Sequence, residues 1–333
     1  MNTMKWLLRR EFWEHKGGFV WAPLIAAVIM VALVGGMIGY GISTDRLGGD
    51  SVTITLGGEQ VHGSNRNGAA IAGLAERHAR GEIANVAANN YIATGAPIFI
   101  VLPIVAFFYC LGALYDDRRD RSILFWKSLP ISDTTTVLSK LLTALVLAPA
   151  ITIGIASAAA FLILMLGGVA ASHQGINLFG PVLGNVNLYL SPLYLLAMIP
   201  VYILWALPTA GWLLLVSSWA KSKVFLWAVG VPLIAAVLLK WMDYLLALYG
   251  ATINADWIIN NVVETLLLGL VPGAWFMDGG TALPIRDQHG VDMLSVLGAS
   301  WGSLARPELW VGVAAGVAMI AGAIRLRRWR DEG

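Results

Sequence analysis

The residues that could carry out chemistry are few in this chain, and they are scattered. The single cysteine, Cys110, lies inside an apolar run, so neither an intrachain disulfide nor a cysteine-based zinc site can form. The five histidines show no H-x-x-H or H-E-x-x-H spacing, and the sequence contains no G-x-x-x-x-G-K-[ST] loop for binding ATP. We therefore expect no catalytic residue, no metal site and no P-loop in this chain.

Three ionisable residues lie within or beside apolar runs. Lys240 and Asp243 are three residues apart and could pair on one helix face, although a lysine that extends toward the polar interface is the simpler interpretation. Glu264 lies in the apolar run Trp257–Phe276, where an acidic group must line a wet path or find a partner. Glu264 is therefore a candidate for a functional role, as a residue that lines an outer exit.

The segment Asp116–Thr136 is the most informative in the chain. It opens with six consecutive charged residues, which we expect to end the preceding helix in water, and continues with the apolar sequence Ile123-Leu-Phe-Trp126. An apolar cluster in a short loop needs a partner, and the residues alone leave two open: the membrane interface, or a groove on a second protein. Ser132 or Asp133 can cap the helix that follows.

The composition places these residues in a membrane protein. Of 333 residues, 58% are hydrophobic and only 13% are charged, with a net charge of +2 and a mean hydropathy of +0.72. Soluble domains are about 45–50% apolar and about 25% charged. The excess apolar surface must face lipid.

Six apolar runs are long enough to cross a bilayer, which needs about 20 residues. They are Phe19–Ile42, Ala96–Tyr115, Val137–Gly168, Ser191–Ser218, Val224–Tyr249 and Leu309–Leu326. An amphipathic interfacial helix is expected over residues 3–16, and a long polar outer segment over 43–95. We expect one all-α transmembrane domain over residues 1–333.

The positions of lysine and arginine set the orientation. With the N-terminus inside, 15 of the 22 basic residues fall in the four inner segments, as the positive-inside rule requires. A seventh crossing by Trp257–Phe276 would put the basic tail outside, so we expect a re-entrant hairpin over 257–277, entered and left from the outer face. The prediction is a multi-pass protein of the bacterial inner membrane with both termini in the cytoplasm.

The layout resembles the permease subunits of ATP-binding-cassette exporters of the second type, also called type V exporters. The interfacial helix, six spans and outer re-entrant hairpin match, and Arg121-Ser-Ile-Leu-Phe-Trp-Lys-Ser-Leu-Pro-Ile-Ser132 looks like the coupling segment of that family. The resemblance implies docking of this cytoplasmic loop, 116–136, into a separate ABC ATPase subunit. The implied contact residues are Ile123, Leu124, Phe125, Trp126, Leu129 and Pro130, with Lys127 as a charge at the rim.

The same resemblance implies a non-catalytic subunit that works as a dimer, with a second copy or a homologous permease. ATP and magnesium would bind to the partner ATPase, and no nucleic acid is expected. The alternative is an ion-coupled secondary transporter or channel, which usually places several ionisable groups at mid-membrane. An intramembrane enzyme ranks last, because the predicted spans contain no histidine.

Overall fold

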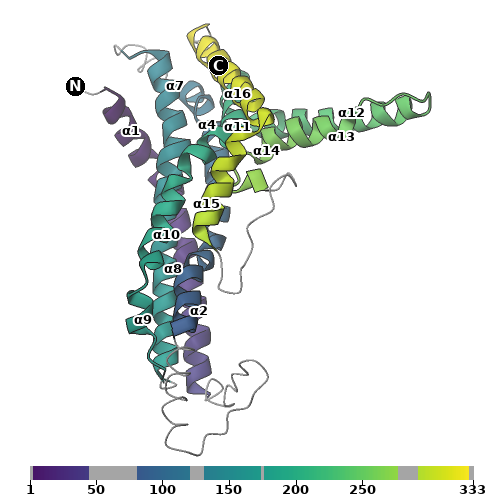
Figure 1. Ribbon diagram of the computed structural model, residues 1–333. Helices are drawn as coiled ribbons and strands as arrows, with labels where there is room; N and C mark the ends of the chain where they lie inside the picture. The colour runs from purple at the N-terminus through teal and green to yellow at the C-terminus, as the bar shows by residue number, and fades with distance from the viewer. Residues whose placement is uncertain (1–2, 45–80, 121–130, 174–175, 277–291, 330–333) are drawn as a thin grey trace, which may run out of the picture.

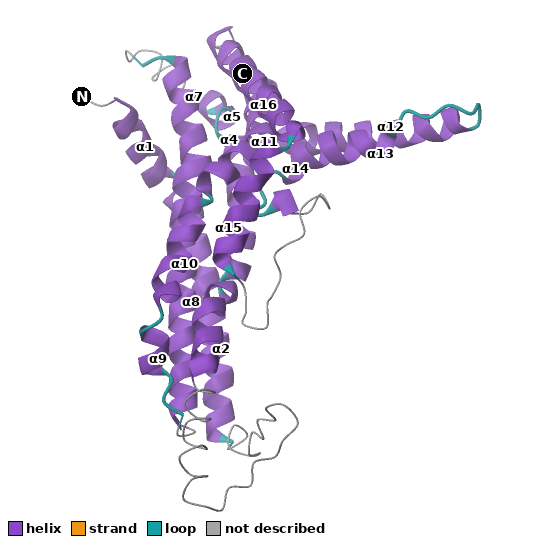
Figure 2. Ribbon diagram, viewed as in Figure 1, coloured by secondary structure: helices purple, strands orange, loops and turns teal. Residues whose placement is uncertain are grey.

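The computed structural model describes residues 3–44, 81–120, 131–173, 176–276 and 292–329, and these residues form helices and loops without a strand (Figure 2). Six helical runs are long and apolar enough to cross a membrane. They are Gly17–Ser43, Gly81–Arg119, Asp133–His173, Val186–Trp219, Leu226–Ala247 and Pro307–Trp329. Each contains most of one predicted span, so the all-α polytopic fold is confirmed.

Two of the runs are much longer than their predicted spans. The second begins at Gly81 because the helix over 81–94 leads through the 3-10 turn Ala96–Ile100 into α4 (Val101–Gly112). The third run has 41 residues and joins α7 (Asp133–Leu142), a π-helical turn (Thr143–Leu147) and α8 (Ala148–His173). Of the predicted outer segment 43–95, residues 45–80 lie outside the described residues.

The helices form an elongated bundle whose two chain ends lie at the same end (Figure 1). We call this the terminal end. It holds α1 (Thr3–Glu14), α5 (Tyr115–Arg119) and the last turns of α11 (Ile199–Trp219) and α16 (Pro307–Trp329). Helix α1 turns through the π-helical segment Gly17–Trp21 into α2 (Ala22–Ser43), which packs along α8.

Proline divides the fourth run into two helices. Helix α10 (Val186–Ala197) starts at Asn185, whose side-chain oxygen accepts a hydrogen bond from Asn187 N at 2.9 Å. It ends at Met198, and α11 begins with Pro200 in its first turn, where a missing backbone N–H costs nothing. The short helix α9 (Phe179–Leu183) precedes this pair.

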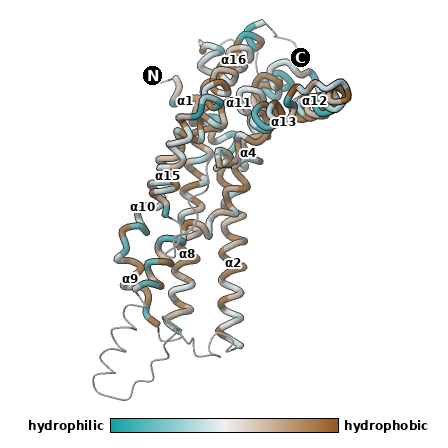
Figure 3. Tube along the Cα trace, turned by 45° about the vertical axis from the view of Figure 1, so that its right-hand side comes forward, coloured by the Kyte–Doolittle hydropathy of each residue, from teal (hydrophilic) through white to brown (hydrophobic). Residues whose placement is uncertain are grey.

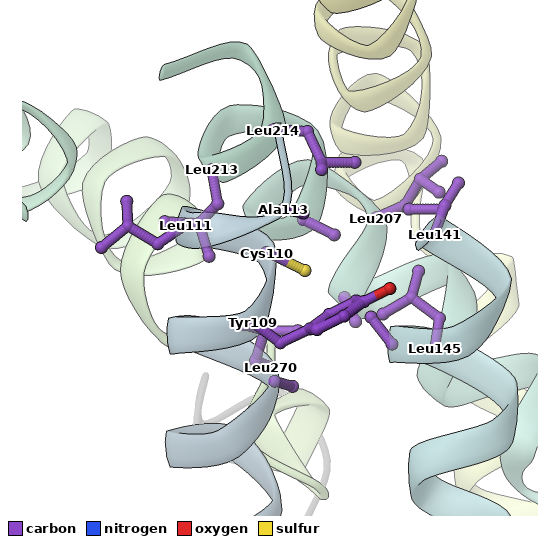
Figure 4. Close-up of a cluster of buried hydrophobic side chains, with 14 of the residues drawn as sticks. Tyr109, Cys110, Leu111, Ala113, Leu141, Leu145, Leu207, Leu213, Leu214 and Leu270 are labelled. Atoms are coloured by element: carbon purple, nitrogen blue, oxygen red, sulfur yellow. The ribbon is translucent and has the colours of Figure 1, made fainter. Parts of the chain in front are cut away.

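Helices α11 and α16 pack most closely, and glycine permits it. A Cβ on Gly316 would lie 2.9 Å from the carbonyl of Leu207, and one on Gly211 would lie 2.7 Å from the Gly316 oxygen. Around this contact, buried side chains from α4, α7 and α11 converge (Figure 4). They include Tyr109, Cys110, Leu141, Leu213 and Leu214.

The fifth run does not lie along the bundle. Helix α12 (Val231–Ala247) follows a π-helical turn (Leu226–Gly230), and the run α13 (Ala255–Ile258), Ile259–Glu264 and α14 (Thr265–Leu268) returns beside it. The pair projects sideways from the bundle (Figure 1), includes many hydrophobic residues (Figure 3), and exposes large apolar side chains such as Ile234 and Val237. We call it the projecting hairpin.

The returning arm of the projecting hairpin covers the first half of the segment 257–277 that was predicted to be re-entrant. The helical arm over 255–268 pairs with α12 rather than with a second arm inside 257–276, where the chain makes turns and a 3-10 turn (Ala274–Phe276). Tyr202 Oη donates to Leu270 O at 3.1 Å, which fixes the base of the hairpin against α11. Residue 277 lies outside the described residues, and a re-entrant path stays a prediction.

The chain then returns through α15 (Met293–Gly302), which packs on α10. Asp292 caps α15, with its Oδ1 accepting from Leu294 N at 3.0 Å. A 3-10 turn (Ser303–Ala305) leads into α16.

Candidate functional site: a buried ion network at the terminal end

The predicted docking residues, Ile123 through Lys127 together with Leu129 and Pro130, lie outside the described residues. Both flanks of that segment are described, however. On one side is α5, and on the other Ser132 caps α7, with its Oγ accepting from Thr135 N at 3.1 Å. The predicted cap is confirmed, and it fixes the point where the loop ends.

The run of six charged residues does not lie wholly in water, as the sequence led us to expect. Asp117 and Arg118 are only 8% and 7% exposed. The short helix α5 turns this pair inward, whereas the side chains of Asp116, Arg119 and Asp120 are exposed. The expectation was wrong because partners far away in sequence were available to both residues: the Arg327 guanidinium for Asp117, and the backbone carbonyls of Ser217 and Ala220 for Arg118.

One arginine of the last helix holds both stems of the loop. Arg327 Nη1 donates to Asp117 Oδ2 at 3.0 Å, before the loop, and Arg327 Nε donates to Asp133 Oδ1 at 3.2 Å, after it. Arg327 is itself 4% exposed. A planar guanidinium with several donors in fixed directions suits this bridging role better than a lysine would.

A lysine extends the network to the N-terminal helix. Lys140 Nζ lies 3.5 Å from Asp117 Oδ1 and 3.2 Å from Glu11 Oε1. Tyr109 Oη donates to Glu11 Oε2 at 2.9 Å. Glu11 is fully buried and Lys140 is 2% exposed, so the two charges meet away from water.

Glu11 was not among the residues predicted from the sequence. It lies one turn after Leu7, on the same face of α1, and both are buried. A carboxylate on the apolar face of an amphipathic helix signals a buried cationic partner, and this signal could have found it.

The neighbouring Arg118 ties α5 to the end of α11. Its Nη2 donates to Ser217 O at 2.6 Å and to Ala220 O at 3.0 Å. Ser217 Oγ in turn accepts from the backbone N–H groups of Leu114 and Tyr115. These contacts satisfy carbonyls at a helix end, which otherwise lack partners.

The network therefore joins α1, α4, α5, α7 and α16 around the loop stems. Removing one member of a buried ion pair leaves an unpaired charge and costs about 3–5 kcal/mol. The arrangement is thus able to make the position of the loop depend on the positions of the first and last helices.

Among the described residues, one acidic and histidine group lies close enough to hold a metal ion: Glu11, Glu14 and His15. Lys140 and Tyr109 already occupy the carboxylate of Glu11. A metal ion would have to displace them, so this group gives little support to a metal site.

The ionisable residues of the projecting hairpin pair differently from the prediction. Lys240 Nζ contacts Asp256 Oδ1 across the hairpin, whereas Asp243 Oδ1 accepts from Ile253 N at 2.9 Å. Lys240 and Asp243, whose pairing was the less favoured interpretation, therefore make two separate contacts that close the hairpin. Glu264 is exposed on the returning arm and lines neither of the two cavities described below.

The sequence Gly298-Ala-Ser-Trp-Gly302 has the G-x-S-x-G spacing of many serine hydrolases. Ser300 lies within α15 and is fully buried. Its hydroxyl donates to Val296 O at 2.7 Å and accepts from Trp275 Nε1 at 3.1 Å. In the hydrolases with this motif the serine lies on an exposed strand-to-helix elbow beside a base, whereas Ser300 is buried inside a helix and bonded to Val296 and Trp275, so it acts here as a packing and hydrogen-bonding residue.

Two cavities on the bundle are lined by described residues. One, of about 450 Å³, lies at the terminal end between the α1–α2 turn and α4, and we call it the inner cavity. The other, of about 370 Å³, lies among helix 81–94, α8 and α9 and is lined mostly by apolar residues, including Ile163, Leu164 and Phe179.

Comparison with known proteins identifies no relative: no family model, no curated protein and no solved structure matches this chain.

Proposed function

We propose that this chain is the transmembrane subunit of an ATP-driven exporter, coupled to a separate ATPase through residues 121–132. One observation supports the proposal most strongly. Arg327 bridges Asp117 and Asp133 and so holds both ends of the proposed docking loop. A loop that must transmit a push from a partner protein needs such rigid stems, because a slack loop would absorb the movement.

The position of the first and last helices beside the loop stems agrees with a role in coupling to an ATPase. The first and last helices meet the loop stems at one end of the bundle through Glu11, Lys140 and Arg327. In the proposed orientation this end faces the cytoplasm, where the ATPase, ATP and magnesium would be.

A second permease subunit is part of the proposal. The projecting hairpin leaves large apolar side chains exposed, among them Leu233, Ile234 and Val237. Lipid or a second copy would cover this surface, and a substrate path between two copies is the expected arrangement.

The ion-coupled transporter or channel is the competing proposal. It would draw on Lys240, Asp243 and Glu264, but Lys240 and Glu264 are exposed on the projecting hairpin. The buried ionisable groups described above gather instead at the terminal end, beside the loop stems.

The test is a double substitution in the loop. Phe125→Asp combined with Trp126→Asp places two charges where an apolar groove is expected to receive aromatic side chains, and should abolish co-purification of the ATPase. Large aromatic side chains commonly dominate protein interfaces. The amount of chain in the membrane fraction should stay unchanged.

Trp329→Asp is the matched control, because Trp329 is 82% exposed at the same end of the bundle but outside the loop. It should retain the ATPase. If the double variant still retains its ATPase, the docking proposal is wrong. Transport in vesicles that proceeds without ATP but follows an ion gradient would favour the competing proposal.

A further inference from the structure

The inner cavity is lined by acidic and aromatic side chains, most of which take no part in the ion network. Its volume is about 450 Å³, and it lies where α1 turns into α2 and faces α4. Two acidic side chains line the cavity, Glu14 and Asp116. Four side chains with rings also line it: His15, Phe19, Phe108 and Tyr109. Ile104 and Val105 extend the apolar wall.

The lining carries negative charge without a lysine or arginine of its own. Glu14 is partly compensated, since Arg10 Nη2 contacts its Oε2 at 3.1 Å from outside the lining. Within the described part of the chain, no lysine or arginine forms an ion pair with Asp116 at contact distance, although Arg119 and His15 lie close enough to act on its charge, so Asp116 is the less compensated of the two acids.

Aromatic side chains form the wall beside these acids. Tyr109 packs edge-on against His15 with ring centroids 4.8 Å apart, and against Phe19 at 4.9 Å. Ring faces attract organic cations, and the attraction adds to that of a nearby carboxylate. Phe108 is 57% exposed and keeps the mouth of the cavity apolar.

Two glycines permit close contacts in the wall of the cavity. A Cβ on Gly112 would lie 2.5 Å from Asp116 Oδ2, so only glycine lets that carboxylate lie back against α4. A Cβ on Gly18 would lie 3.1 Å from Val105 Cγ1, which shows how closely the α1–α2 turn approaches α4.

We propose that the inner cavity binds an organic cation joined to an apolar body, with the cation at Asp116 and Glu14 and the apolar part against Phe108, Ile104 and Val105. The ligand would be either a lipid with an ammonium headgroup or a free cationic amphiphile. The proposal concerns binding by this chain alone, so it does not depend on the exporter function and can fail separately from it.

The test uses two ions of the same shape and opposite charge on the purified full chain in detergent. Equilibrium dialysis should show that tetraphenylphosphonium binds at least about tenfold more tightly than tetraphenylborate, a factor equal to about 1.4 kcal/mol. Asp116→Asn should weaken the phosphonium binding by about tenfold, and Glu14→Gln by a smaller factor.

Asp120→Asn is the matched control, because Asp120 is an exposed aspartate four residues away that does not line the cavity. It should weaken phosphonium binding much less than Asp116→Asn does, because Asp120 acts on the site only through its charge beside Asp116. Equal binding of the two ions, unchanged binding by a folded Asp116→Asn variant, or an equal loss in Asp120→Asn would each overturn the proposal. If Asp116→Asn does not fold, unchanged binding by Glu14→Gln together with Phe108→Ala would also overturn it.

A second measurement separates the two sources of ligand. Chains released from bilayers of mixed phosphatidylethanolamine and phosphatidylglycerol would be weighed by native mass spectrometry. Retention of phosphatidylethanolamine by the unmodified chain and by Asp120→Asn, with its loss in Asp116→Asn, identifies a lipid site. Phosphonium binding without a retained lipid identifies a site for free cationic amphiphiles.

Discussion

Single residues decide how the first helix is attached to the bundle. Glu11 is fully buried and receives both the Lys140 ammonium at 3.2 Å and the Tyr109 hydroxyl at 2.9 Å. Lys140 also contacts Asp117 at 3.5 Å. This lysine therefore compensates two carboxylates, and its removal should cost more than the loss of an ordinary surface ion pair, which is worth about 0–1 kcal/mol.

Lys140→Met should destabilise the protein by about 3–5 kcal/mol, because it leaves Glu11 and Asp117 buried without their shared cation. The check is the thermal unfolding midpoint of the purified chain in detergent. Lys221→Met is the control, since Lys221 is exposed, and it should change the midpoint little.

Combining Lys140→Met with Glu11→Gln should recover part of the lost stability, because the buried carboxylate that depends most on this lysine is then neutral, whereas Asp117 keeps its contact with Arg327. An additive loss in the double variant would show that the two residues do not interact as an ion pair.

The sequence predicted this region only in part. Ser132 as a helix cap followed from its place before the helix, because capping is local in sequence. The burial of Asp117, Arg118 and Glu11 did not follow, since each depends on a partner about 100 or more residues away, such as Ser217 for Arg118 or Lys140 for Glu11. No periodicity in the chain connects such pairs.

At the scale of helices, hydropathy and length were sufficient to place the six candidate spans, because backbone hydrogen bonds must be satisfied within each apolar run. They could not show which helices touch. The motif Gly312-x-x-x-Gly316 was one of many glycine spacings, and only the structure shows it against α11, with Gly312 facing Pro208. The sideways course of α12 was likewise not encoded in its composition.

Gly316→Ala should destabilise the α11–α16 contact by about 1–3 kcal/mol, the usual cost of adding a methyl group to a filled site. The added Cβ would meet backbone atoms of Leu207 and Pro208 at 2.9–3.0 Å, and backbone cannot move aside as a flexible side chain can. The unfolding midpoint in detergent measures the effect.

Gly154→Ala on α8 provides the comparison, because a Cβ there meets nothing within 4 Å. It should be neutral or stabilising by up to about 1 kcal/mol through helix propensity. Equal effects of the two substitutions would contradict the close-packing explanation.

Asp292 makes the start of α15 sensitive to acid. A hydrogen bond from the Ser295 hydroxyl, aided by backbone N–H groups, holds the pKa of Asp292 below its usual value of 3.8. Because the folded pKa is lowered, the stabilisation is present above pH 3.8 and is lost as the pH falls through the lower folded value.

Asp292→Ala should therefore loosen α15 at neutral pH by about 0.5–2 kcal/mol, the typical cost of a lost N-cap. Limited proteolysis at sites within Met293–Gly302 measures this loosening, and the difference from the unmodified chain should shrink below pH 3.8. A difference that persists unchanged in acid would show that the ionised carboxylate is not the stabilising group.

For the whole molecule, the described polar chemistry is concentrated at one end. The ion network, the loop stems and the inner cavity all lie at the terminal end, and the apolar cavity near Phe179 lies away from them. If the proposed function is correct, a partner that moves the loop would act on the ion network and on the wall of the inner cavity together.

The helical run Asp133–His173 connects the loop stems at the terminal end with the apolar cavity at the other end of the bundle. Its 41 residues would extend about 60 Å at 1.5 Å per residue, about twice the thickness of the hydrocarbon core. At one end Arg327 donates a hydrogen bond to Asp133, and near the other end Gly167 and Gly168 line the apolar cavity. If the proposed function is correct, tilting this run by about 5° at the end held by Arg327 would shift its far end by about 5 Å, so that movement of the loop stems would reshape that cavity at the other end of the bundle.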